Sequence, residues 1–205
     1  MLIKICGLTR PGDAEVAIEA GADLLGFVFV PGTPRFVDPS RAIWIRDLVG
    51  VEKVGVFRDQ ELDSIVAIRD ALGLDRVQLH GEEPDSWLET LGPDTLRRVR
   101  PDDVDPWRRP AMLAGRCLPL LDPGAGDGVA FNWDSLRRRP IGLWVGIAGG
   151  LNPQNVTGAI HAVRPALVDV SSGVESAPGI KDPDLVAAFV VAARAAVESA
   201  ALDSR

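Results

Sequence analysis

Three side chains that could carry acid–base chemistry stand where short apolar runs of the sequence end. Cys6 ends the run LIKIC, His80 follows RVQL, and Asp122 follows LPLL. A cysteine and a carboxylic acid that face one another could act as general base and general acid, and partial burial would keep Asp122 protonated near neutral pH by raising its pKa. The structural alternatives stay open. A free cysteine is usually a small core residue, a carboxylate can simply hold a loop, and His80 can be a hydrogen-bonded structural residue.

Two loops of small residues follow the last two apolar runs. Gly149 and Gly150 follow GLWVGIA, whereas Ser171, Ser172 and Gly173 follow LVDV. In many barrels the loops after the seventh and eighth strands bind phosphate through backbone N–H groups, so this pair of loops predicts a phosphate site. The alternative is that the glycines only form tight turns.

Three charged residues extend the candidate site. Lys4 is charged within an apolar run, and Asp169 sits within the last such run. Side chains alternate along a strand, so Lys4 shares a face with Cys6, and a closed barrel makes the first and last strands neighbours. We therefore expect Lys4 and Asp169 to pair inside the barrel, because an unpaired buried charge is costly; the alternative is two unrelated charges at the rim. Arg35, in PGTPRFV, could clamp a carboxylate, although an isolated arginine is more often a solvated surface charge.

The elements that must position these residues alternate between apolar runs and helical patterns. The predicted strands are residues 2–6, 24–30, 53–57, 76–80, 95–99, 117–121, 142–148 and 167–171. The predicted helices are residues 11–20, 39–48, 61–72, 84–91, 153–163 and 182–200, with a short or irregular helix within 100–116. Thr9 and Asn152 are the expected caps of the first helix and of helix 153–163.

This alternation predicts a single (β/α)8 TIM barrel spanning residues 1–205. Eight units in 205 residues give about 26 residues per unit, which is compact for this fold. Near-continuous apolar strands indicate a parallel sheet covered on both faces. The main alternative is a doubly wound open sheet, and the lack of a dinucleotide-binding glycine motif after the first strand speaks against it. In a TIM barrel the strand ends that carry the candidate residues form one rim, where active sites lie.

Composition limits the classes of function. Lys and Arg number 22 and Asp and Glu 29, so the net charge is −7, which disfavours nucleic acids and anionic membranes as partners. A small anionic substrate is still possible at a locally positive site. Neither Cys6 nor Cys117 belongs to a CxxC motif. We therefore expect a cytoplasmic protein with reduced thiols, and we expect Cys117 to be a core residue. Two histidines exclude a His-rich metal site, and no apolar stretch approaches a membrane span. The sequence leaves monomer and homodimer open.

Six segments form a specific set: KICGLT, GADLLGFVF followed by PRFV, VGVF, VQLHGEE, AGGLNPQNV and RPALVDVSSGVESAPGIKD. In this order they resemble the phosphoribosylanthranilate isomerase family over nearly the whole chain. The resemblance implies an Amadori rearrangement of a phosphosugar substrate, N-(5-phosphoribosyl)anthranilate, without cofactor or metal. It assigns Cys6 as general base, Asp122 as general acid, Arg35 to the anthranilate carboxylate, and the two small-residue loops to phosphate. The thiol would have to be partly ionised near pH 7, which a nearby cation such as Lys4 could favour.

One region departs from the family pattern. The segment after the sixth strand is shortened to DPGAGDGVAFNW, with Val129 where a lysine and Asn132 where an aspartate would be expected. Because this loop often covers substrate, residues 123–132 could alter affinity or substrate range. Two alternatives follow: a related phosphosugar isomerase with broadened specificity, such as one acting on the histidine-pathway analogue, and a barrel that binds ligand without turnover. A metal-dependent epimerase is disfavoured by the two histidines.

Overall fold

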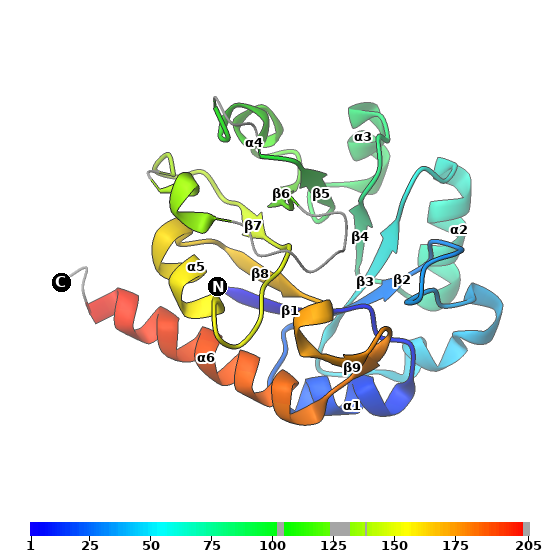
Figure 1. Ribbon diagram of the computed structural model, residues 1–205. Helices are drawn as coiled ribbons and strands as arrows, with labels where there is room; N and C mark the ends of the chain where they lie inside the picture. The colour runs from blue at the N-terminus through cyan, green and yellow to red at the C-terminus, as the bar shows by residue number, and fades with distance from the viewer. Residues whose placement is uncertain (102–104, 124–131, 138, 203–205) are drawn as a thin grey trace.

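The computed structural model describes residues 1–101, 105–123, 132–137 and 139–202, and its central feature is a closed barrel of parallel strands (Figure 1). The barrel strands are β1 Leu2–Cys6, β2 Leu24–Val28, β3 Glu52–Phe57, β4 Arg76–Leu79, β5 Leu96–Val99, β6 Leu118–Leu121, β7 Gly146–Ile147 and β8 Leu167–Val170. Each strand pairs with the next, and β1 pairs with β8 to close the ring. The predicted TIM barrel is therefore confirmed, and the open-sheet alternative is excluded.

Helices surround the barrel and cover its outer face. They are α1 Pro11–Glu19, α2 Leu62–Leu72, α3 Leu88–Leu91, α4 Arg108–Leu113, α5 Val156–Val163 and α6 Pro183–Leu202. Outward-facing strand residues such as Ile3, Phe27 and Val168 belong to a large core shared with these helices. Inward-facing leucines, among them Leu24 and Leu167, form a smaller cluster that fills the barrel interior. Alternation along each strand thus divides its residues between two cores.

Several predicted elements are shorter than the sequence pattern suggested. The seventh strand pairs only at Gly146–Ile147, because residues 141 and 142 form a turn and 143–145 run unpaired toward the barrel. The predicted helix 39–48 is instead two 3₁₀ helices, Pro39–Arg41 and Ile43–Asp47, separated by Ala42 outside helical geometry. Ile43 and Ile45, in the second half of this segment, have weak helix propensity. Ile45 is buried in the core.

The structure differs from the prediction at the helix caps but agrees with it at the fifth helix. Thr9 is not a cap, because its hydroxyl donates to the Gly179 carbonyl, 2.7 Å away. Asn152 is not the N-cap of α5 either, because α5 begins at Val156 with Asn155 as its N-cap. The Asn152 side chain instead accepts hydrogen bonds from the N–H groups of Gln154 and Asn155, in the turn that leads into α5. The fifth helix is short, as expected, and spans only Arg108–Leu113.

A hairpin that the sequence did not predict follows β8. Its strands are β9 Glu175–Ala177 and β10 Ile180–Lys181, and it leads directly into α6. Figure 1 shows this hairpin beside the mouth of the barrel, near the start of α1. The hairpin also touches the loop after β2, since a Cβ added at Gly179 would lie 2.7 Å from the Pro34 carbonyl oxygen. Among the described residues, no helix is long and apolar enough to cross a membrane.

Candidate active site

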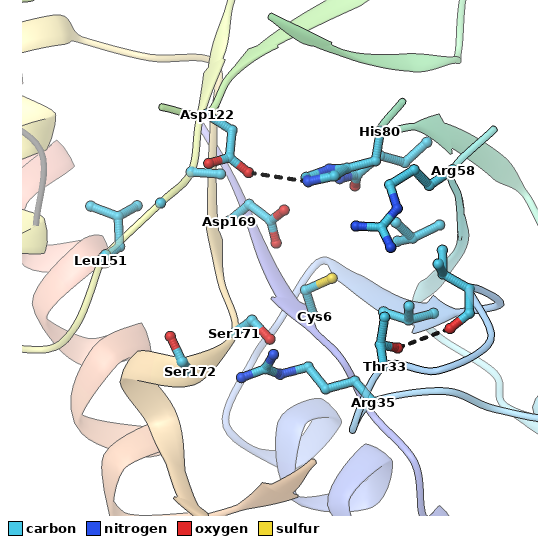
Figure 2. A pocket seen from close by; sticks show the side chains of 17 residues that line it. Cys6, Thr33, Arg35, Arg58, His80, Asp122, Leu151, Asp169, Ser171 and Ser172 are labelled. Atoms are coloured by element: carbon cyan, nitrogen blue, oxygen red, sulfur yellow. Dashed lines mark hydrogen bonds and ion pairs between the residues drawn. The ribbon is translucent and has the colours of Figure 1, made fainter. Parts of the chain in front are cut away.

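A cavity opens where the barrel strands end, on the rim predicted to hold the site (Figure 2). It is lined by Cys6, Val28, Val30, Thr33, Arg35, Val56, Arg58, Gln78, His80, Asp122, Ala148, Gly149, Gly150, Leu151, Asp169, Ser171 and Ser172. The structure thus brings most of the predicted site residues to one place. Lys4 and Gly173 stand outside the lining, each packed directly against residues within it.

The predicted ion pair between Lys4 and Asp169 is confirmed. The Lys4 Nζ atom lies 3.0 and 2.9 Å from the two carboxylate oxygens of Asp169, and the Lys4 side chain is fully buried. Register explains the contact, because Lys4 on β1 stands directly opposite Asp169 on β8. Burial opposes the charge of Lys4, but Asp169 and the sulfur of Cys6 together raise the Lys4 pKa above its ordinary value. The base of the cavity therefore carries a protonated lysine.

Cys6 stands above this pair, two residues along the same face of β1. Burial raises the pKa of the Cys6 thiol, and the neighbouring Lys4 ammonium opposes that effect without overcoming it. Lys4 therefore favours the thiolate, as expected, although burial has the larger effect on the Cys6 pKa. Desolvation of the thiolate in an enclosed site outweighs the favourable charge.

Asp122 and His80 face each other across the cavity from β6 and β4 (Figure 2). His80 Nε2 and Asp122 Oδ2 are 3.7 Å apart. Burial, with Arg98, Lys4 and other cations nearby, lowers the pKa of His80 to about 3, so its imidazole is neutral at physiological pH. The two side chains consequently form no ion pair.

Arg35 is not a solvated surface charge. Its Nε and Nη2 atoms each donate to a carboxylate oxygen of Glu175 at 2.8 Å, and only 18% of the Arg35 side chain is exposed. Glu175 also accepts from Lys181 Nζ at 2.8 Å, and Lys181 donates to the Ser171 carbonyl. Burial opposes ionisation of Glu175, yet hydrogen bonds from these two cations hold its pKa below the usual range. Two cations share one carboxylate, so this cluster keeps a net positive charge beside the cavity.

The two predicted phosphate loops lie next to each other. Gly149 and Gly150 have φ values of +89° and +66°, which favour glycine, and both line the cavity. Gly173 packs against the other loop, because a Cβ added there would lie 1.9 Å from the Leu151 carbonyl oxygen. The hydroxyl of Ser171 is buried and has no hydrogen-bond partner within the described part of the chain. The two loops thus meet at the cavity, with the Ser171 hydroxyl beside them.

Comparison with known proteins identifies the family. Residues 3–192 match the family model described as N-(5'-phosphoribosyl)anthranilate (PRA) isomerase. The chain belongs to the phosphoribosylanthranilate isomerase family. Relatives of that name from Geotalea daltonii and Myxococcus xanthus are 41% and 43% identical over 199 and 202 residues, covering 94% of this chain and 96% and 95% of theirs.

Solved structures of the family agree in fold. The isomerase from Thermotoga maritima is 36% identical with a TM-score of 0.84, covering 95% of this chain and 100% of its own. A second family structure, 36% identical with a TM-score of 0.80 and the same coverage, is a complex with reduced 1-(o-carboxyphenylamino)-1-deoxyribulose 5-phosphate. These likenesses extend over the barrel as a whole.

Sequence reasoning missed some residues of this family member's site. Arg58 lines the cavity directly after β3, so the rule applied to the other strand ends could have found it. Glu175 lies in the segment RPALVDVSSGVESAPGIKD, but no role was predicted for it. Trp133, which follows β6 at the start of a 3₁₀ helix, is buried and absent from the cavity lining. Asn132 is exposed just before the 3₁₀ helix Trp133–Leu136, whereas Val129 lies outside the described residues.

Proposed function

We propose that the chain catalyses the Amadori rearrangement of N-(5'-phosphoribosyl)anthranilate to 1-(2-carboxyphenylamino)-1-deoxyribulose 5-phosphate. The observation that carries this proposal is the meeting of Cys6 and Asp122 in one cavity from opposite strands, β1 and β6. A thiol and a carboxyl group so placed supply the base and the acid that an aldose–ketose rearrangement requires. Membership of the family and the product-like ligand of a relative support the same assignment.

Asp122 acts first, as the general acid. Its carboxyl proton passes to the ring oxygen of the ribose while the bond from that oxygen to C1' breaks. The nitrogen lone pair forms a C1'–N double bond, which leaves a cationic iminium and an open chain bearing a hydroxyl group. Partial burial of the Asp122 carboxyl, which is 12% exposed, suits a group that must deliver a proton within an enclosed site.

Cys6 then acts as the general base. The thiol first releases its proton to solvent, and the positive charge of the nearby iminium then favours the thiolate that burial otherwise disfavours. The thiolate removes the proton from C2', and the electrons of that C–H bond form the C1'–C2' double bond as the iminium is neutralised. The resulting enolamine tautomerises to the ketone. Lys4, itself held by Asp169, supports the negative sulfur from below.

The two anionic ends of the substrate fix its direction. Arg35 would hold the anthranilate carboxylate, and its fixed guanidinium is already oriented by Glu175. The loops at Gly149–Gly150 and 171–173 would hold the phosphate through backbone N–H groups and the Ser171 hydroxyl. The sugar between these anchors would span Cys6 and Asp122.

Turnover of freshly generated phosphoribosylanthranilate, followed by loss of its fluorescence, tests this proposal. Turnover of the histidine-pathway analogue is measured alongside. Turnover of the first substrate alone supports the isomerase. Turnover of both would support broadened specificity, and turnover of neither by folded protein would favour a binding barrel.

The remaining expectations about the protein are also proposals. We propose that residues 1–205 act as one catalytic domain in the cytoplasm. The described catalytic residues all come from this one chain, so either a monomer or a homodimer would hold its own site. Sedimentation of the purified protein distinguishes the two states.

A further inference from the structure

Gly26, in the second strand, packs against both Cys6, the proposed base, and the neighbouring Lys4. Gly26 on β2 is directly opposite Cys6 on β1, and both face the barrel interior. A Cβ added at Gly26 would lie 2.7 Å from Cys6 Sγ and 2.9 Å from Lys4 Nζ. Both distances are shorter than real Cβ contacts permit. The space that a side chain would fill is therefore occupied by the sulfur and the ammonium group together.

Backbone conformation does not explain this glycine. Gly26 is absent from the positions with positive φ, so another residue could adopt its extended geometry. Its carbonyl oxygen accepts hydrogen bonds from the N–H groups of Gly7 and Leu8 at 2.9 and 3.0 Å, but any residue type offers that carbonyl. What distinguishes glycine here is the missing Cβ. The requirement therefore concerns the space inside the barrel.

We propose that Gly26 is a positioning residue, whose missing side chain lets the Lys4 ammonium lie against the Cys6 sulfur. The inference rests on the proposed function, in which Cys6 is the base. The charged groups that face Cys6 are Lys4 on β1, Asp169 on β8, Lys181 on β10 and the nearby Arg35. Of these, Lys4 is the largest favourable influence on the thiolate. Displacing the ammonium would leave burial and Asp169, both of which disfavour ionisation, opposed by the weaker influence of Lys181.

The substitution Gly26→Ala isolates this effect. The two shortest contacts of the new methyl group involve the far ends of flexible side chains, so we expect the strand to persist while the Lys4 and Cys6 side chains move apart. In a Cys117→Ala background, the pH profile of Cys6 alkylation by iodoacetamide reports the thiolate without any substrate. We expect the profile to shift upward by one pH unit or more, a tenfold loss of thiolate at fixed pH, and kcat to fall about tenfold with a smaller change in KM.

The matched control is Gly158→Ala on α5, where an added Cβ meets nothing within 4 Å. It should leave the alkylation profile and kcat unchanged. An unshifted profile in Gly26→Ala would overturn the proposal. If wild-type protein lacks isomerase activity but Gly26→Ala still shifts the profile, the proposed function fails while the contact between Gly26, Lys4 and Cys6 stands.

A second variant covers the case in which Gly26→Ala does not fold. The double variant Cys6→Ala/Gly26→Ala removes the sulfur that the methyl group would meet. Recovery of the native circular dichroism spectrum would place the conflict at the sulfur, as proposed. Failure to recover would place the conflict away from the sulfur, at Lys4 Nζ or at the Cys6 Cα, 2.9 and 3.0 Å from the added Cβ, and would overturn the role of Gly26 in making room for the sulfur.

Discussion

Lowering the pH should destabilise the protein through His80. In the native state its pKa is lowered to about 3, whereas an unfolded chain titrates near the ordinary value of 6.5. Below pH 6.5 the unfolded chain takes up a proton that the native chain refuses, so stability present above this pH is lost as the pH falls. Between pH 7 and pH 5 linkage gives a loss of about 2 kcal/mol from this one residue.

Urea unfolding at pH 7, 6 and 5 measures this loss. Carboxylates add their own pH dependence, so the comparison is between wild type and His80→Asn, whose free energy of unfolding should fall by about 2 kcal/mol less over the same interval. His161→Asn is the matched control, because His161 lies exposed on α5, away from the cavity. Equal pH slopes for wild type and His80→Asn would show that the native site accepts the proton, which would refute the reasoning.

Three further predictions test the site and its support. Cys6→Ala and Asp122→Asn should each lower kcat by about 10² to 10⁴ while circular dichroism stays native, as measured by steady-state fluorescence assays. Lys4→Met should cost about 3–5 kcal/mol of unfolding free energy in urea, because Asp169 is left buried without its cation. Arg35→Ala should raise KM by about 10- to 100-fold with a smaller change in kcat, since a charged hydrogen-bonding partner of the substrate is lost. Unchanged values in any of these assays would contradict the corresponding assignment.

The barrel was predictable because its signals are local. Each apolar run is a strand, and the strict alternation of side chains was enough to place Lys4 opposite Asp169 once the ring was assumed to close. Strand limits were less predictable, as at β7, where Trp144 belongs to the predicted run yet is 72% exposed. An apolar composition does not say where hydrogen-bonded pairing begins.

The contacts that tune the site were harder to predict. Arg35 and Glu175 are 140 positions apart and meet only because the hairpin after β8 folds over the loop after β2. The raised Cys6 pKa depends on how completely the barrel excludes water, which residue types alone do not reveal. Gly26 carries no side chain to suggest chemistry. Its signal, a glycine inside an apolar strand, is a common mark of close approach and could have been used.

The seam between β1 and β8 also bears on how the chain is made. Its ion pair joins residues 165 positions apart, so β1 is synthesised long before the barrel strand that it pairs with on this side. Until β8 emerges, β1 lacks a neighbour along one edge and Lys4 has no counter-ion. Such distant contacts slow folding and leave strand edges open to other chains. We therefore expect nascent chains that end before β8 to depend on chaperones. We also expect the ring to close late, with Cys6 and Lys4 reaching their final places together.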